Sequence, residues 1–115
     1  MNIISYIKRY LIFNFKSKKK LIKLKNFKNL DELFRFYNTD KSSNYHGFAK
    51  FYEKFFHEYK YKKINLMEIG SAQGGSAAAF NSYFDNCKIY CFDNHIENFL
   101  YKSNFITPIL IDCSN

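Results

Sequence analysis

The sequence predicts an α/β protein with a doubly wound parallel sheet that is truncated after about three strands and preceded by N-terminal helices. Three apolar runs with the length of buried strands occupy 64–69, 88–93 and 108–111. A helix is expected over 75–84 after the first run, and a short helix over about 95–102 after the second. Strands that alternate with helices in this way pair in parallel, because the helices serve as crossover connections.

Before the first strand, apolar residues recur at helical spacing. They predict an amphipathic helix over about 3–15 and another over about 47–61. Between them, a short helix begins with Asp31 and Glu32, which favour a helix N-terminus because of the helix dipole. The helix over 47–61 carries an aromatic stripe, whose spacing favours packing in the core over stacking on nucleic-acid bases. The stripe consists of Phe48, Phe51, Tyr52, Phe55 and Tyr59.

The chain has 115 residues, which allow one domain. A doubly wound sheet usually needs more strands than these to cover both of its faces, so we interpret the chain as the front part of a larger domain. A basic N-terminal helix and linker are expected over 1–28, and the N-terminal part of the domain over 29–115. The sheet edge left open after the third strand would invite self-association.

The net charge of +8 is concentrated in the first half of the chain. Residues 1–63 carry 16 Lys and Arg against 5 Asp and Glu, whereas residues 64–115 carry 2 against 5. Such asymmetry is compatible with a contact between residues 1–28 and an anionic membrane surface. However, Lys, Asn, Ile, Phe and Tyr are all abundant and all have AT-rich codons, so base composition explains the lysines without a polyanionic partner. We therefore expect no specific binding to nucleic acid.

The cysteines and the N-terminus indicate a reduced, cytoplasmic protein. Cys87, Cys91 and Cys113 are odd in number and include no C-x-x-C pair, which argues against a disulfide framework or a zinc ribbon. Lys8 and Arg9 interrupt the apolar start of the chain, so it does not resemble a signal peptide. No apolar run reaches the length of a transmembrane helix.

A glycine-bearing loop joins the first strand to the helix that follows it. Gly70 ends the strand, where the backbone must turn sharply and can approach a ligand without a Cβ in the way. Gly74 and Gly75 lie where the helix begins, and the N–H groups there favour a carboxylate or another anionic group. Ser76 can cap the helix or add a donor. The alternative is an ordinary strand-to-helix turn without a ligand.

Acidic residues end the next two strands. Asp93 follows Gly74 by 19 residues, and a carboxylate there can accept hydrogen bonds from the two hydroxyls of a ribose, or else cap a helix that begins near His95. Asp112 can accept from an adenine amino group or another polar ligand group, or it is a turn residue. Because Ala72 replaces the second glycine of G-x-G-x-x-G, a ligand without phosphates fits the loop better.

The stretch 68–76, read as E-x-G-x-x-x-G-G-S, resembles motif I of class I S-adenosylmethionine-dependent methyltransferases. It is most similar to the branch that contains macrolide-sugar O-methyltransferases and cephalosporin-hydroxylase-like proteins. Upstream, the residues over 38–41, then 46–48 and Tyr52, resemble the T-D-K…H-G-Y…Y segment of that branch, with Phe48 where tyrosine is common. The resemblance covers about residues 35–115.

The resemblance implies a Rossmann-like fold and S-adenosyl-L-methionine as cofactor, with 29–115 as the N-terminal part of a class I methyltransferase domain. The methionine part would lie against the glycine loop, with Glu68 near its amino end, Asp93 at the ribose and Asp112 near the adenine. Cys113 stands where the branch usually has a polar residue. The cofactor-binding residues implied in this way are Glu68, Gly70, Ser71, Gly74, Gly75, Ser76, Asp93, Asp112, Thr39 and Lys41.

The resemblance implies that the loop with Thr39, Asp40, Lys41 and His46 would close over the cofactor or the substrate, although without the resemblance it is simply a helix connection. His46 is the one candidate for a catalytic residue. The spacing of the three histidines does not form a metal site. In this branch a divalent metal, its ligands and the general base for a sugar hydroxyl would come from later strands, which this chain does not include.

The sequence therefore favours methyl transfer to an oxygen of a small-molecule acceptor, such as a sugar, by a fragment that is not expected to be active alone. A nicotinamide-dependent oxidoreductase is one alternative, since it would use Asp93 in the same way, but its glycine loop differs. A non-enzymatic binding module that uses the basic residues 1–28 is another.

Overall fold

Three parallel strands form one sheet in the computed structural model of the chain, which describes residues 3–4, 27 and 29–112. The strands are β1 (Lys63–Ile69), β2 (Asn86–Asp93) and β3 (Ile106–Leu110), in the order β1-β2-β3. Ile69 pairs with Phe92, and Asp93 pairs with Leu110, so the carboxyl ends of the strands meet at one edge of the sheet. The α/β fold with parallel strands is confirmed.

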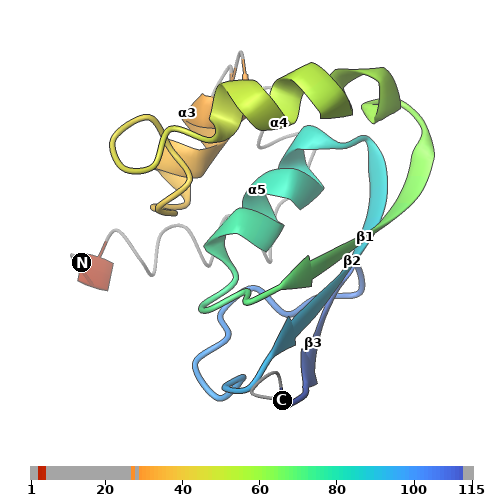
Figure 1. The fold of residues 1–115 in the computed structure, drawn as a ribbon. Helices are drawn as coiled ribbons and strands as arrows, with labels where there is room; N and C mark the ends of the chain where they lie inside the picture. The colour runs from red at the N-terminus through yellow and green to blue at the C-terminus, as the bar shows by residue number, and fades with distance from the viewer. Residues whose placement is uncertain (1–2, 5–26, 28, 113–115) are drawn as a thin grey trace.

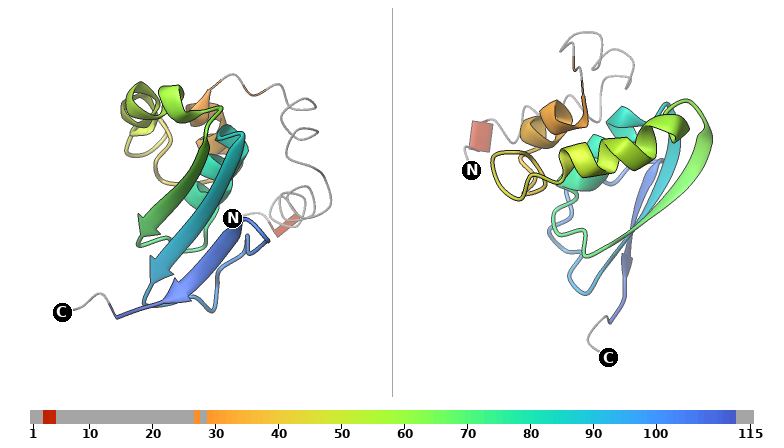
Figure 2. Two further views of the ribbon diagram at one scale, coloured as in Figure 1. Left: turned by 90° about the vertical axis from the view of Figure 1, so that its right-hand side faces the viewer. Right: turned by 45° about the horizontal axis from the view of Figure 1, so that its top comes forward.

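Helix α5 (Gly75–Tyr83) connects β1 to β2 and packs on one face of the sheet (Figures 1 and 2). Ala77, Ala78 and Ala79 are completely buried, because small side chains allow the helix to approach both the sheet and the helices above it. The facing strand residues are also buried, including Ile89 of β2 and Ile106 of β3. Among the described residues, helices cover this face of the sheet and leave the opposite face exposed.

Helix α3 (Leu30–Phe36) begins where the sequence predicts a helix, with Asp31 and Glu32 in its first turn. The side chain of Asn29 accepts a hydrogen bond of 2.9 Å from the backbone N–H of Glu32, which satisfies one of the unpaired donors of the first turn. The ring of Phe34, on the buried face of α3, meets Phe80 of α5 edge to face at a centroid distance of 5.4 Å. Helix α3 thus covers α5 on the side away from the sheet.

Helix α4 (Ala49–Phe56) and the 3-10 turn η1 (His57–Tyr59) lead into β1. The prediction that the aromatic stripe of this helix packs in the core is wrong for most of its members. Tyr52 does pack against Phe80, at a centroid distance of 5.4 Å, and the neighbouring Phe56 packs beside it. The rest of the stripe is exposed: Phe48 by 46%, Phe51 by 64%, Phe55 by 51% and Tyr59 by 42%.

The physical reason is the rotation of α4 about its axis. Ala49, Tyr52 and Phe56 recur at i, i+3 and i+7, and this narrower row faces α5. Glu53 fixes the rotation, because its carboxylate Oε1 accepts a hydrogen bond from the backbone N–H of Leu30 at the start of α3. The remaining aromatic residues lie on the adjacent side of the helix.

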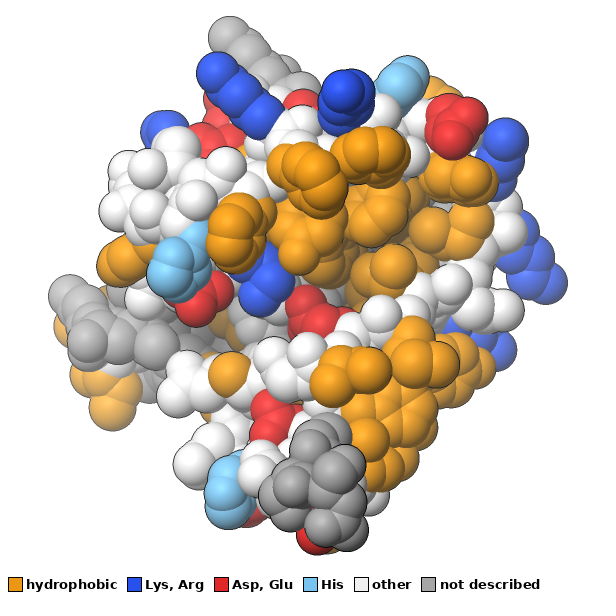
Figure 3. Space-filling model, viewed as in Figure 1, with side chains coloured by type: hydrophobic (Ala, Val, Ile, Leu, Met, Phe, Trp, Pro, Cys, Tyr) orange, Lys and Arg blue, Asp and Glu red, His pale blue; other side chains and the backbone are white. Residues whose placement is uncertain are grey.

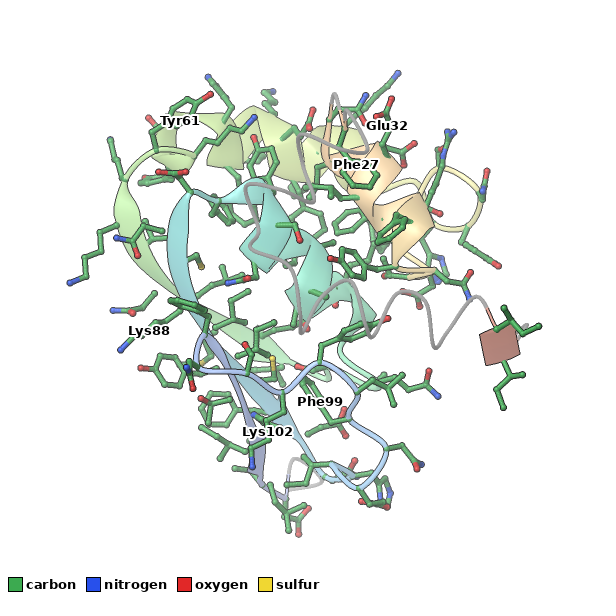
Figure 4. The ribbon with its side chains drawn as sticks, turned by 180° about the vertical axis from the view of Figure 1, so that it is seen from behind. Phe27, Glu32, Tyr61, Lys88, Phe99 and Lys102 are labelled. Atoms are coloured by element: carbon green, nitrogen blue, oxygen red, sulfur yellow. The ribbon has the colours of Figure 1, made fainter. Side chains whose placement is uncertain are left out.

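The helix expected over 95–102 is also absent, and residues 94–105 form a loop. The loop is held by other contacts: the backbone N–H of Leu100 donates to the carbonyl of Gln73 at 3.0 Å, and Tyr101 is buried against Tyr37. Phe99 of this loop approaches the helix side of the sheet (Figure 4). Strand β3 begins two residues before the predicted start and includes Pro108, which an edge strand tolerates.

The predicted helix over 3–15, the linker over 16–28 and Cys113 lie outside the described residues, apart from Ile3, Ile4 and Phe27. The division of the chain at residues 28 and 29 therefore remains a prediction. In the part of the chain that the structure describes, no helix has both the length and the apolar character needed to cross a membrane.

Truncation of a core aromatic side chain should destabilise the fold strongly. Phe34→Ala removes a completely buried ring, and we expect it to lower the free energy of unfolding by about 3–5 kcal/mol in a denaturant titration followed by circular dichroism. Phe105→Ala is the control, because Phe105 is 52% exposed, and its effect should stay within about 0.5 kcal/mol. Equal losses in the two variants would contradict this description of the core.

Candidate cofactor pocket

Two loops enclose a pocket of about 210 Å³ at the carboxyl end of β1. One is the glycine loop over 70–75, and the other connects α3 to α4. The loop between β2 and β3 closes the third side. The lining residues are Tyr37, Asn38, Thr39, Asp40, Lys41, Gly70, Ser71, Ala72, Gln73, Gly75, Ser76, Leu100 and Tyr101.

The glycines of the pocket loop meet different steric demands. Gly70 and Gly74 have φ angles of 78° and 90°, in the left-handed region that side chains disfavour. A Cβ at Gly74 would also lie 2.6 Å from the ring of Phe99. At Gly75 a Cβ would lie 3.0 Å from the carbonyl oxygen of Tyr37, so glycine there allows the α3–α4 loop to pack against the start of α5.

Glu68 lies behind the pocket wall rather than in it. Its carboxylate Oε2 accepts a hydrogen bond of 2.6 Å from the hydroxyl of Ser76, which does line the pocket. The other oxygen, Oε1, is buried and has no hydrogen-bond partner in the structure. Because Ser76 gives its hydrogen to Glu68, its oxygen is left as an acceptor toward the pocket.

Asp93 braces the glycine loop from the end of β2. Its Oδ2 accepts from the backbone N–H of Ala72 at 2.8 Å, and its Oδ1 accepts from the N–H of His95 at 3.1 Å. These backbone donors, Ala72 first, lower the pKa of the Asp93 carboxyl. Ala72 has a left-handed φ of 49°, and the hydrogen bond helps to hold that conformation. Asp93 itself does not line the pocket.

The segment 39–41 and the glycine loop line the same pocket. The buried Thr39 accepts a hydrogen bond of 3.3 Å from the N–H of Lys41 through its hydroxyl. The Nζ of Lys41 lies 3.8 Å from Oδ1 of Asp40, and all three residues line the pocket. A cation and a hydroxyl thus line the same pocket as the N-terminus of α5, and a Cβ at Gly75 would lie 3.7 Å from the Cβ of Thr39.

Other predicted site residues lie outside the pocket lining. His46 is exposed, stacks on Phe48 at 5.4 Å and approaches Asp40 with its Nε2 at 3.6 Å from Oδ2. Asp112 is exposed beyond the end of β3. Gly74 is shielded by Phe99. Within the described ranges, no three His, Cys, Asp or Glu side chains lie close enough to hold a metal ion.

Several lining residues were missed by sequence reasoning. Asn38 adopts a left-handed φ of 54°, which asparagine tolerates, and its place next to the T-D-K segment could have indicated it. Tyr37 and Tyr101 are buried, and their rings meet edge to face at 5.4 Å. Burial raises the pKa of Tyr37, so this wall of the pocket stays neutral. No sequence pattern singled out Leu100 or Tyr101, because the loop that carries them has no periodicity.

No known family model matches the chain, and no curated protein matches its sequence. Solved structures do match. The MycE methyltransferase from the mycinamycin biosynthetic pathway, in complex with Mg, SAH and mycinamycin VI, matches with a TM-score of 0.68 and 27% identity. The match covers 74% of this chain and 25% of that one. Two crystal forms of MycE with Mg and SAH match with the same TM-score and identity. These matches cover 25% and 23% of the respective MycE chains.

The chain therefore spans about a quarter of the length of the solved MycE chains that it matches. The resemblance to methyltransferases that residues 68–76 and 38–41 carry is confirmed by this structural match. The chain is thus an α/β protein with the Rossmann-like fold of a methyltransferase, and it matches MycE over 74% of its residues.

Proposed function

We propose that the chain binds S-adenosyl-L-methionine and forms the cofactor half of a methyltransferase that acts on an oxygen of a small molecule such as a sugar. One observation carries the proposal: residues from both segments that resemble the family, 38–41 and 68–76, line one pocket although 26 residues of chain separate the two segments. The match to MycE, which was solved with SAH and mycinamycin VI, supports the choice of cofactor and of acceptor class.

The residues of the pocket fit the amino-acid end of this cofactor. The first N–H groups of α5 lack intrahelical partners, and together with the cation of Lys41 they can bind a carboxylate. The hydroxyl oxygen of Ser76, oriented by Glu68, can accept from an ammonium group. A pocket of about 210 Å³ is smaller than the roughly 300–1,000 Å³ of a whole ligand site, so it suits this part of the cofactor alone.

The remainder of the cofactor would extend toward the end of β2. Asp93 accepts from the backbone N–H of Ala72 on Oδ2 and of His95 on Oδ1, and a carboxylate has lone pairs for further donors. It can therefore accept from the ribose hydroxyls while it continues to brace the loop. We extend the proposal to Asp112 for the adenine, since it follows β3, the next strand in the sheet.

When bound, the cofactor supplies a methyl group on a positively charged sulfur. The residues of this chain would hold the cofactor and exclude water from one side of it, which contributes by alignment. We expect an acceptor site, a general base and a divalent metal to be provided by polypeptide beyond this chain, because it spans only about a quarter of the MycE chains. Methyl transfer by the chain alone is not expected.

Calorimetric titration with S-adenosylhomocysteine tests the cofactor proposal. We expect saturable binding, and Ser76→Ala should weaken it by about 10- to 100-fold, because loss of a hydrogen bond to a charged group costs about 1.5–3 kcal/mol. Ser103→Ala is the control, since Ser103 lies outside the pocket lining. A folded chain that binds NADH and not S-adenosylhomocysteine would contradict the proposal.

A methyl group at position 75 should lower the affinity of the pocket for its ligand and leave the stability of helix α5 unchanged. Gly75→Ala places a Cβ against the carbonyl of Tyr37, so we expect the α3–α4 loop to shift and the affinity for S-adenosylhomocysteine to fall about tenfold or more. Gly70→Ala is the matched variant, because its Cβ meets nothing within 4 Å. Its left-handed φ should instead cost stability, about 1–2 kcal/mol in a denaturant titration. If Gly75→Ala lowered only the stability and Gly70→Ala lowered only the affinity, Gly75 would have no role in the shape of the pocket.

The charge of Asp93 should set the acid limit of cofactor binding. Since its pKa is lowered, the carboxylate and its hydrogen bonds persist through mildly acidic pH and are lost only as the pH falls through that lowered pKa. Asp93→Asn should therefore weaken binding at pH 7 and reduce the dependence of affinity on pH below about 4. An identical pH profile in both proteins would argue against a role of this carboxylate.

A further inference from the structure

The crossover segment, residues 99–101 of the loop between β2 and β3, contacts the glycine loop at two successive positions. The ring of Phe99 lies against Gly74, where an added Cβ would be 2.6 Å from the ring. The backbone N–H of Leu100 donates to the carbonyl of Gln73 at 3.0 Å. The glycine loop is thus held from outside just before α5 begins.

The crossover segment also reaches the other loop of the pocket. Tyr101 is buried, and its ring meets that of Tyr37 edge to face at a centroid distance of 5.4 Å. Tyr37 in turn places its carbonyl oxygen beside Gly75, where an added Cβ would be 3.0 Å away. The segment therefore joins the two loops that enclose the pocket, the glycine loop and the α3–α4 loop.

Gly74 links the contact with Phe99 to the first turn of α5. It is the N-cap residue of the helix, and its carbonyl accepts a hydrogen bond of 2.9 Å from the N–H of Ala78. Its own N–H donates to the carbonyl of Ser71 at 2.9 Å. A shift of Gly74 would consequently move the glycine loop and the start of α5 together.

Phe99 reaches Gly74 from outside the pocket. It does not line the pocket, and its partly buried ring packs on the hydrophobic core at the helix side of the sheet (Figure 4). The exposed aromatic side chains of α4 do not line the pocket either, and hydrophobic side chains gather over that helix in Figure 3. Substitution of Phe99 therefore leaves the lining of the pocket chemically unchanged.

We propose that Phe99 is a positioning residue for the amino-acid end of the cofactor and acts through Gly74. Its ring packs where a side chain at Gly74 would otherwise lie, and so it fixes the first turn of α5 relative to the loop that carries Lys41. A carboxylate that binds both the N–H groups of this turn and the Lys41 cation depends on that spacing, because a site must hold its groups within about 0.5 Å of the productive geometry. The inference rests on the proposed function and adds one residue to it.

The ribose end of the cofactor depends on different contacts. Asp93 pairs with Leu110 of β3 through the backbone, and its carboxylate accepts from the N–H groups of Ala72 and His95. These contacts hold Asp93 from the sheet and from the start of the β2–β3 loop. Loss of the Phe99 ring should thus weaken ligands that carry the amino-acid end and spare ligands that end at the sulfur.

Two calorimetric titrations of the full chain separate these ends. S-adenosylhomocysteine carries the amino-acid end, whereas 5′-methylthioadenosine keeps the nucleoside and the sulfur but lacks the amino and carboxyl groups. We expect Phe99→Ala to raise the Kd of S-adenosylhomocysteine about tenfold or more, and that of 5′-methylthioadenosine by less than about threefold. Phe105→Ala is the matched control from the same loop, because Phe105 is 52% exposed, and it should change neither Kd by more than about twofold.

A double-mutant cycle tests whether Phe99 acts through Gly74. A methyl group at position 74 would displace the ring, so Gly74→Ala should weaken S-adenosylhomocysteine by itself. The left-handed φ of 90° disfavours alanine in both backgrounds, so this strain cancels in the cycle. We expect the combined loss in Gly74→Ala with Phe99→Ala to be at least about threefold smaller than the product of the two single losses, since residues in contact couple.

The outcomes distinguish this inference from the proposed function. Equal losses for the two ligands in Phe99→Ala, no loss for either, or single losses that multiply in the double variant would overturn the role of Phe99 alone. A folded wild-type chain that binds neither ligand overturns both proposals. Circular dichroism checks folding, and Phe99→Leu replaces Phe99→Ala where alanine prevents it. Leucine keeps apolar volume in the core but lacks the ring atoms Cζ, Cε1 and Cε2 that approach Gly74.

Discussion

The burial of α5 on nearly all of its sides is the constraint on which the rest of the structure depends. The helix lies between the sheet and α3, so its side chains must be small where both neighbours approach, as Ala77, Ala78 and Ala79 are. Its first turn consequently lies at the carboxyl end of β1. Gly75 then leaves room for the carbonyl of Tyr37, and this contact brings the α3–α4 loop over the start of the helix. The pocket is a consequence of that packing.

Two carboxylates hold the pocket loop from opposite ends. Glu68 binds the hydroxyl of Ser76 after the loop, and Asp93 binds the N–H of Ala72 within it. Both residues therefore shape the site before any ligand arrives. A carboxylate that supports a strained loop and also accepts from a ligand couples loop conformation to binding, since loss of either hydrogen bond would loosen the same few residues. For this reason an acidic residue at a strand end can indicate a ligand site even when its side chain does not line the pocket.

The strands and their parallel order could be predicted from the sequence, because buried strands and the glycine loop leave strong local patterns. The orientation of α4 could not. Its aromatic residues form two adjacent rows, and apolar periodicity alone does not say which row is buried. The choice depends on Ala49, whose small side chain allows close approach, and on the hydrogen bond from Leu30 to Glu53, which is a contact between distant residues. The loop over 94–105 was mistaken for a helix for the same reason, since Gln73 and Tyr37 hold it from outside.

Local sequence patterns predict only part of the pocket. Spacing alone indicated that the glycine loop binds a ligand, but only the family resemblance joined Thr39 and Lys41 to that loop. The geometry then separates two tasks. The walls described here surround the amino-acid end of the proposed cofactor, whereas a methyl acceptor must approach the sulfur–methyl bond in line from elsewhere. If the proposed function holds, substitutions in these walls should alter how tightly and in what orientation the cofactor binds, without changing which acceptor is methylated.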